Sequence, residues 1–416
     1  MHDDQTSFAD RTAFIVELAR RLHTYGTNSP RLEAALTRAS ERLGLRCEVW
    51  SNPTGIIISF GGGSEASIGA ESTRVLRLPP GDVDLRKLCE ADAIAERVMI
   101  GELELRGGLA ALRALDRPAS SITRWRSAAS FGLASASVAG LFGGGLAEIS
   151  VAATIGLMIG MLTVFGSGSP RVAEASDALA AFVASLFAAA IASFVLPLAL
   201  KPVIIAALIV LLPGMTLTVA AAELTSQHLV SGTARFAGAM ATLAKLTFGT
   251  VAANELVRFL GWLPMESSLA GAPVWLELLS LLTAGFSFAV LFQAAYRDYP
   301  LVMLAAGLSY AITRLSGLWL NTGPGDFPTG VFLSAMTVTA LGNLYARWRN
   351  RPGAVIRVPG IILMVPGSVG FRSLSSLMEG DVLVGLDTAR ILVVALVALV
   401  AGLLFGNLIA PARRSL

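Results

Sequence analysis

Long apolar runs fill the chain from about residue 127 onward and constrain its fold more than any other feature. A helix needs about 20 mostly apolar residues to cross the hydrocarbon core of a bilayer. Backbone groups in lipid must also satisfy their own hydrogen bonds, which a helix does. Ten runs have a suitable length, at residues 127–147, 149–166, 176–198, 201–222, 232–258, 273–295, 299–320, 328–346, 354–371 and 388–410. We therefore predict an α-helical integral membrane protein with about ten transmembrane helices.

Charge divides the chain into two regions. Only 15% of all residues are charged, whereas ordinary soluble domains carry about 25%. Residues 1–126 hold 17 basic and 17 acidic side chains, and residues 127–416 hold only 15 basic and 12 acidic ones. The first region has about the size of one domain. We therefore predict a soluble domain at residues 1–126, followed by the membrane region.

The soluble region has the pattern of a small α+β domain. Residues 14–45 favour two amphipathic helices, with Gly26 at the end of the first. Three β-prone segments follow, at residues 46–50, 54–60 and 73–78. Residues 82–115 are helical in pattern, with breaks expected near Gly101 and Gly107. The glycine-rich stretch 61–69 lacks the lysine and the strand–helix context of a phosphate loop, so a hairpin connection is the simpler interpretation.

The sequence offers little for catalysis or cofactor binding. Besides serines, the reactive candidates in the soluble region are His23, Cys47 and Cys89. Two cysteines make no disulfide framework, and no metal-ligand spacing is present. The net charge is +3, but most of the positive excess lies in the membrane part, so it does not argue for nucleic acid. We predict that the chain is not an enzyme and takes no metal or cofactor.

The basic residues predict an orientation. Cytoplasmic loops of membrane proteins are enriched in lysine and arginine. With the soluble region in the cytoplasm, the cytoplasmic loops and tail carry Arg124, Arg126, Arg171, Arg235, Arg297, Arg347, Arg349, Arg351, Arg357, Arg413 and Arg414. The outer loops then carry only Lys201, Arg258, Arg372 and Arg390. We predict a multi-pass protein of the bacterial inner membrane with both termini in the cytoplasm.

The membrane region also shows signs of an internal repeat. Five matches recur in order at separations of 150 to 155 residues: Glu148 with Asp298, Gly156 with Gly307, Lys201-Pro202 with Arg351-Pro352, Pro213-Gly214 with Pro366-Gly367, and Thr233–Arg235 with Thr388–Arg390. Each half, 127–262 and 263–416, would have five spans. Because five is odd, the second half would enter the membrane from the opposite side. Such a 5+5 inverted repeat is typical of secondary transporters.

The two Pro-Gly pairs lie inside apolar runs, as "VLLPGMTLT" at Val210–Thr218 and "LMVPGSVGF" at Leu363–Phe371. One interpretation is that they only kink a helix. The other is that each splits a helix into halves whose exposed N–H ends face a cavity and attract a carboxylate. We predict a substrate site formed by Pro213, Gly214, Thr216, Thr218, Pro366, Gly367 and Ser368. The two threonines have an alternative role, which is to satisfy backbone groups freed by Pro213.

Lys245 lies near the middle of the fifth apolar run. A cation at the bilayer centre costs about 2.5–3.5 kcal/mol on insertion scales, so we expect it to face the bundle interior or a cavity. There it could bind a substrate carboxylate. The alternative is a structural ion pair with Glu223, Glu255 or Glu148.

Three acidic residues stand at the ends of predicted spans: Glu148, Glu223 and Asp298. Each has two interpretations. One is a solvated loop residue. The other is a group that is exposed alternately to the two sides, takes up and releases a proton, and so couples transport to the proton gradient.

Several stretches of the chain resemble the threonine/serine exporter family. They are "LARRLHTYGTNSPRLEAAL", "LLPGMTLTVAAAEL" and "LMVPGSVGFRSLSSLMEGD". The chain is similar to the fused form, with a cytoplasmic domain and both membrane halves. Val219 and Glu223 depart from the asparagine and aspartate usual after the first Pro-Gly pair, and Glu148 stands where aspartate is common.

The resemblance implies export of small polar amino acids such as threonine and serine. Related split members are linked to succinate export, which makes a dicarboxylate exporter the alternative. A membrane-anchored hydrolase with its site in residues 1–126, or a channel, are further alternatives. The expected partners are a small amino acid or carboxylate, protons and the lipid bilayer, with a homo-oligomer left open and no nucleic acid.

Overall fold

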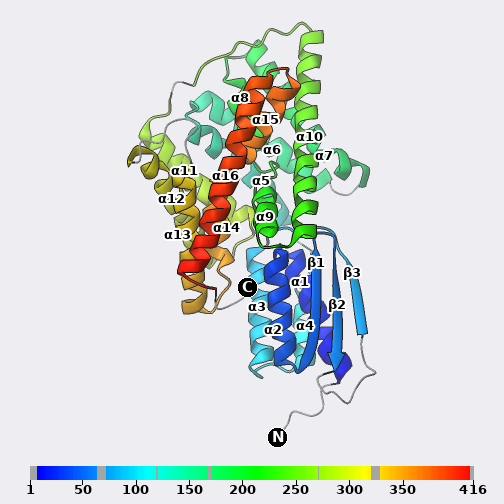
Figure 1. Cartoon of the computed structure of the whole chain (residues 1–416). Helices are drawn as coiled ribbons and strands as arrows, with labels where there is room; N and C mark the ends of the chain where they lie inside the picture. The colour runs from blue at the N-terminus through cyan, green and yellow to red at the C-terminus, as the bar shows by residue number, and fades with distance from the viewer. Residues whose placement is uncertain are drawn as a thin grey trace.

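The computed structural model describes residues 7–62, 72–118, 120–166, 170–269, 271–319 and 328–412. The described chain forms a small α+β domain followed by a large helical region (Figure 1). The predicted hairpin stretch 61–69 falls mostly outside these residues, and so do Arg413 and Arg414.

The soluble domain has four helices and a three-stranded sheet. The strands β1 (Leu45–Asn52), β2 (Gly55–Gly62) and β3 (Ser72–Arg77) are antiparallel in the order β1-β2-β3. The helices stand beside this sheet (Figure 1): α1 (Phe8–Thr24), α2 (Ser29–Arg42), α3 (Leu85–Met99) and α4 (Leu105–Ala114). The predicted helices and strands are thus confirmed. Gly101 follows α3 with φ 78°, but Gly107 lies inside α4, so the break expected there is wrong. A single glycine lowers helix stability by only about 1 kcal/mol.

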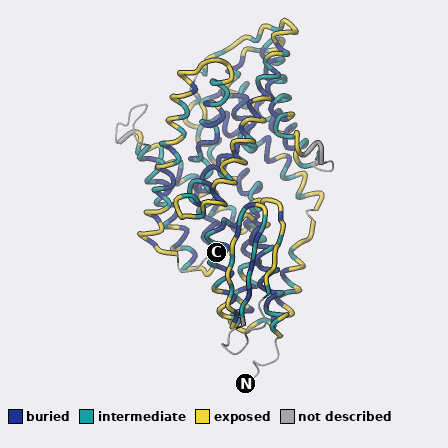
Figure 2. The backbone as a smooth tube through the Cα atoms, turned by 45° about the vertical axis from the view of Figure 1, so that its right-hand side comes forward, coloured by how far each residue is buried: buried dark blue, intermediate teal, exposed yellow. Residues whose placement is uncertain are grey.

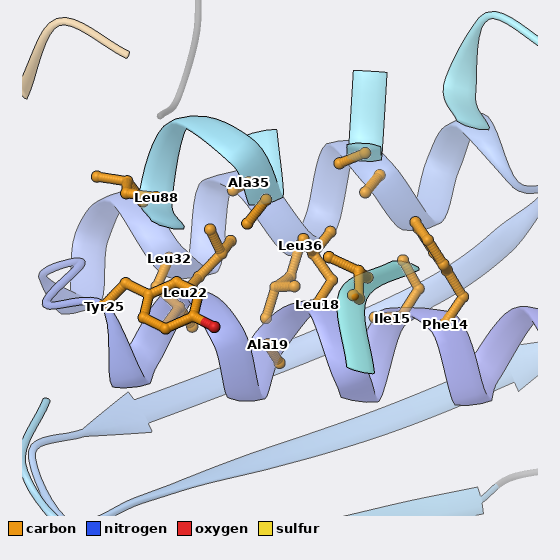
Figure 3. Close-up of a cluster of buried hydrophobic side chains, with 14 of the residues drawn as sticks. Phe14, Ile15, Leu18, Ala19, Leu22, Tyr25, Leu32, Ala35, Leu36 and Leu88 are labelled. Atoms are coloured by element: carbon orange, nitrogen blue, oxygen red, sulfur yellow. The ribbon is translucent and has the colours of Figure 1, made fainter. Parts of the chain in front are cut away.

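The core of this domain forms between the helices. Phe14, Leu18 and Leu22 follow one another at helical spacing on α1, and all are at most 1% exposed. They pack toward Leu36 on α2 (Figure 3). This spacing is the amphipathic pattern that predicted α1.

The membrane region has two similar series of helices. The first series contains α5 (Ser121–Leu141), α6 (Leu146–Gly166), α7 (Pro170–Phe194), α8 (Leu200–Leu208), α9 (Gly214–Thr225) and α10 (Leu229–Phe259). The second contains α11 (Val274–Leu291), α12 (Tyr299–Trp319), α13 (Thr329–Arg349), α14 (Ala354–Ile362), α15 (Gly367–Met378) and α16 (Val382–Ile409). A 3₁₀ turn, η1 (Tyr296–Asp298), precedes α12.

Six described segments are long and apolar enough to cross a membrane: Leu146–Val164, Glu174–Phe194, Leu229–Phe259, Val274–Leu291, Ala354–Met378 and Val382–Ile409. Their outer faces expose large apolar side chains such as Leu282, Leu383 and Leu408, and exposed stretches run along the outside of the helices (Figure 2). Such surfaces suit lipid rather than water. The chain is therefore a membrane protein with several apolar helices, while the count of ten spans stays a prediction.

The soluble domain contacts one end of the membrane helices, which we name the near end. The backbone N–H of Leu85 donates to Phe292 O at 2.9 Å, and the N–H of Ser29 donates to Glu223 Oε1 at 3.0 Å. The apolar core of the domain is continuous with Ala294 and Val302 of the membrane region. We name the opposite end of the helices, where α8 and α15 lie in Figure 1, the far end.

Candidate functional site

Two helices of the membrane region are broken at the Pro-Gly pairs. Helix α8 ends at Leu208 and α9 begins at Gly214, while α14 ends at Ile362 and α15 begins at Gly367. Pro213 and Pro366 precede the new helices with nearly the same backbone angles, φ −79° and ψ 39° against φ −83° and ψ 37°. Proline has no N–H to donate, so it fits the start of a helix and not its interior. Both segments are therefore split helices, not simple kinks.

The two breaks contact each other. A Cβ atom added to Gly214 would lie 3.0 Å from the backbone nitrogen of Gly367, and one added to Gly367 would lie 3.0 Å from Gly214 Cα. Only glycine allows the two backbones to approach this closely. From this contact α9 runs to the near end and α15 toward the far end (Figure 1). The N-termini of two 12-residue helices thus meet, and each carries partial positive charge.

A large cavity lies between this contact and the far end, and Pro213, Gly214, Pro366 and Gly367 are not among the residues that line it. It has a volume of about 950 Å³ and is lined by α8, α10, α15, α16 and the segment between α10 and α11. Ser368, next to Gly367, is part of its wall, as the sequence predicted for a site residue. The polar wall also includes Thr250, Asn254 and Ser375. We name this space the far-end cavity.

The far-end cavity carries charges of both signs. Lys201 pairs with Glu379 at 3.0 Å, and Arg258 pairs with Glu255 at 2.9 Å. Arg372 lies one helical turn after Ser368, lines the cavity and has no ion-pair partner among the described residues. A wall with cations and carboxylates suits a small polar molecule that carries both charges.

A smaller cavity of about 110 Å³ lies between the near end of the bundle and the soluble domain. Met215 and Thr218 of α9 line it, together with residues of α14 and of the segment before α2. Thr218 Oγ1 donates to Gly214 O at 3.1 Å, so its hydroxyl bonds the backbone beside the break, as its alternative role predicts. Thr216 lines neither cavity. We name this space the near-end cavity.

Lys245 lies outside both cavities. Its side chain is 45% exposed, lines neither cavity, donates to Glu174 O at 3.0 Å and lies 3.7 Å from Asp177 Oδ2. The expectation that it faces the bundle interior or a cavity is therefore wrong, and its partner is not Glu223, Glu255 or Glu148. The reason is that α10 packs along α7, where Glu174 and Asp177 supply the polar partners of Lys245.

Glu223 and Asp298 are buried at the near end, so the solvated-loop interpretation is wrong for both. Glu223 is fully buried and accepts hydrogen bonds from Ser231 Oγ at 2.7 Å and from Arg235 Nε at 3.1 Å, besides Ser29 N–H. Asp298 pairs with both terminal nitrogens of Arg351, at 2.6 and 2.7 Å. Tertiary partners explain the burial, because a buried carboxylate is stable only when it is paired.

Glu148 lies at the start of α6 and is half-buried. Its Oε2 accepts from the N–H of Gly145 at 2.9 Å, and Ser267 Oγ lies 3.4 Å from its Oε1. The carboxylate caps the helix and lines neither cavity. Its role in proton coupling stays a prediction.

The sequence reasoning missed several residues of the two cavities. The arginine distribution places Arg372 in an outer loop and Arg357 in an inner one, yet each lines a cavity. The spacing of Ser368 and Arg372, one turn apart on the helix that starts at Gly367, is a signal that could have identified Arg372. Arg31 of the soluble domain had no such signal, because its cavity neighbours come from distant parts of the chain.

Comparison with known proteins gives the same family for both parts of the chain. A family model for a threonine/serine exporter matches residues 13–257, and a second, "Threonine/Serine exporter, ThrE", matches residues 277–409. Together they cover most of the soluble domain and both series of membrane helices. No solved structure matches the chain.

Curated relatives are fungal membrane proteins. The chain is 26% identical over 391 residues to pheromone-regulated membrane protein 10 of Pichia sorbitophila, covering 89% of this chain and 37% of that protein. It is 25% identical over 402 residues to an uncharacterized protein of Schizosaccharomyces pombe, covering 92% and 46%. It is 23% identical over 397 residues to pheromone-regulated membrane protein 10 of Eremothecium gossypii, covering 91% of this chain and 51% of that protein. The chain thus spans about half or less of the length of these relatives.

Proposed function

The chain belongs to the threonine/serine exporter family, and from this premise we propose that it is a secondary transporter that exports threonine or serine. The observation that carries the proposal is the contact of two oppositely directed helix breaks, next to a cavity that Ser368 lines. Broken helices whose N-termini point at a substrate carboxylate are the usual binding element of such transporters.

An inverted 5+5 repeat is the architecture that we propose for the membrane region. Its support is the matching order and length of the helices: α8 and α14 both have nine residues, and α9 and α15 both have 12. The split helices also start with almost identical backbone angles at Pro213 and Pro366. Two copies entering from opposite sides would bring their breaks together from opposite directions.

The substrate would bind beside the Pro-Gly contact. Ser368 and Arg372 would hold the hydroxyl and the carboxylate of threonine, while Asn254 and Glu255 would face its ammonium group. A zwitterionic amino acid needs donors and acceptors at the same time, and the mixed charge of the far-end cavity supports this class of substrate. A dicarboxylate would need a second cation in place of the acids.

Alternating access would use the two cavities in turn. The far-end cavity is large, while the near-end cavity is small and covered by the soluble domain. We propose that the near end faces the cytoplasm of a bacterium, with both termini there, because the predicted near-end loops hold most of the arginines. The structure would then represent an outward-facing conformation.

Proton coupling would use buried acids at the near end. Glu223 and Asp298 each join two parts of the chain through a carboxylate that is paired when ionised. Protonation would weaken these bonds and favour the opening of the near end. Glu148 stays a third candidate at the far end.

Counterflow in proteoliposomes tests the proposed function. Vesicles loaded with unlabelled threonine or serine should take up labelled threonine and serine, whereas vesicles loaded with succinate should not. A pH gradient should drive net accumulation that an uncoupler abolishes. Succinate counterflow without threonine counterflow would support the dicarboxylate alternative. Flux that ignores the pH gradient, together with conductance in a planar bilayer, would indicate a channel. Breakdown of the label in place of its accumulation would indicate a hydrolase.

A further inference from the structure

The near-end cavity is formed jointly by the soluble domain and the membrane helices. Arg31 and Asn28 come from the start of α2, Met215 and Thr218 from α9, and Arg357 from α14. Two guanidinium groups from positions 326 residues apart thus line one small space. Met215 and Thr218 follow Gly214 within one turn, so this space borders the Pro-Gly contact on the side opposite to the far-end cavity.

Neither guanidinium has an ion-pair partner among the described residues. Two near-end acids are already paired, Glu223 with Arg235 and Asp298 with Arg351. Arg357 Nη1 is buried and makes no hydrogen bond with the described atoms. Burial lowers the pKa of Arg31 to about 10, which still leaves it protonated at neutral pH. Both arginines are partly buried, and a cation that loses hydration without gaining a counter-ion is costly, so an anion in this cavity would be favoured.

The same cavity offers acceptors for an ammonium or hydroxyl group. Asn28 Oδ1 and Thr27 Oγ1 are buried without a hydrogen-bond partner in the described chain, and both residues line the cavity. Asn28 stands at the N-cap of α2, but its side chain makes no capping bond. The N-terminus of this 14-residue helix adds partial positive charge beside Arg31.

We propose that the near-end cavity binds the carboxylate of the transported molecule between Arg31 of the soluble domain and Arg357 of α14. The soluble domain then supplies part of the inner binding site and is more than a cover over it. Paired guanidinium groups suit this role, because each can hold a carboxylate through two parallel hydrogen bonds. The inference rests on the proposed transport function for the identity of the substrate, but not for the chemistry of the site.

A binding measurement on the purified full-length protein tests the chemistry. The midpoint of thermal unfolding is followed while threonine, serine, succinate or acetate is added, with L-threoninol, which lacks a carboxylate, as the probe control. Arg31→Gln and Arg357→Gln should each weaken the apparent affinity for the stabilising carboxylates by roughly tenfold or more, since bonds to charged groups are the stronger ones. Arg42→Gln changes an exposed arginine of the same helix and should leave affinity unchanged.

A sided transport measurement tests the location. In vesicles of known orientation, Arg31→Gln and Arg357→Gln should raise KM for threonine supplied at the near end by roughly tenfold and leave KM at the far end unchanged. Arg31→Lys and Arg357→Lys keep the charge and should restore part of the affinity, which a purely structural role would not require.

The outcomes separate the two proposals. If no carboxylate stabilises the wild-type protein, or if the two glutamine variants respond like Arg42→Gln, the carboxylate site is wrong. If carboxylates stabilise the protein through both arginines but threonine and serine show no counterflow, the site stands and the proposed substrate is wrong. Equal rises of KM at both ends would overturn the assignment to the near end.

Discussion

The carboxylate of Glu223 connects three helices of this protein. It is fully buried and holds together α2 of the soluble domain, α9 and α10 through Ser29, Ser231 and Arg235. A buried pair that loses one charge leaves the other uncompensated. The position therefore fixes the attachment of the soluble domain to the near end.

Replacing this carboxylate should loosen the attachment. We expect Glu223→Gln to destabilise the protein by about 3–5 kcal/mol, because Arg235 stays partly buried without a counter-ion. Thermal unfolding of the purified protein measures the effect. Glu255→Gln removes one partner of an exposed pair and should cost less than about 1 kcal/mol. Equal effects of the two variants would contradict the structural role of Glu223.

His23 predicts a pH dependence of stability. Burial lowers its pKa below the ordinary value of 6.5, while its Nε2 lies 3.1 Å from Pro79 O. A lowered pKa means that the unfolded chain binds the proton more readily. This contribution to stability is therefore present above about pH 6.5 and is lost as the pH falls through the folded pKa.

The expected result is a lower unfolding midpoint at pH 5 than at pH 7.5 for the wild type, with a smaller difference for His23→Gln. Asp82 and Asp84 have pKa values raised by burial, which acts in the opposite direction, as stability lost on raising the pH. Because His23→Gln leaves the aspartates unchanged, their contribution to the pH dependence cancels when the two proteins are compared. An identical pH profile in both would exclude His23 as the cause.

At the scale of elements, the position of each helix break depends on local chemistry. The contact between the two breaks depends on the tertiary structure. Proline at 213 and 366 disfavours a continuous helix, so the sequence alone predicts a kink or a break at both positions, and the structure shows breaks. The helices and strands of the soluble domain follow from apolar periodicity in the same way. The contact between Gly214 and Gly367 joins residues 153 apart, and no local pattern specifies it.

The dependence on tertiary contacts also explains why the sequence predicts the burial of several side chains wrongly. Burial of Glu223 and Asp298 comes from partners on other elements, and for Glu223 the partner Ser29 is 194 residues away. An apolar run predicts that Lys245 faces the bundle interior. Whether its side chain is exposed depends instead on which helix packs beside it, and this is a tertiary property. Cavity residues such as Arg31 are brought together only by the docking of two domains.

The glycine contact gives a sharp prediction for the two broken helices. Gly214→Ala should destabilise the protein by about 1–3 kcal/mol and reduce transport, because the added methyl group would overlap Val365 Cγ1 and lie 3.0 Å from Gly367 N. Gly238→Ala is the matched control on α10, where an added Cβ meets nothing within 4 Å. That change should be neutral or stabilise by up to about 1 kcal/mol. Normal transport by Gly214→Ala would contradict the close approach as a requirement.

At the scale of the whole molecule, the soluble domain covers the near end, so the proposed export would require it to move. Cys89 provides a reporter, because it is 8% exposed on α3, and burial raises its pKa to about 11. Both effects slow its reaction with a maleimide. In a Cys47→Ser background, we expect slow labelling of Cys89 at rest and faster labelling during threonine counterflow. A rate that stays constant during transport would mean that the domain remains docked.

The contact between Gly214 and Gly367 also has a consequence for biogenesis. A ribosome delivers α8 and α9 to the membrane more than 140 residues before α15 exists. Until then Gly214 lacks the backbone of Gly367 that lies against it in the folded protein. We therefore expect a chain truncated before residue 367 to leave the first break uncovered, and the first half to reach its final packing only after the second half has been inserted.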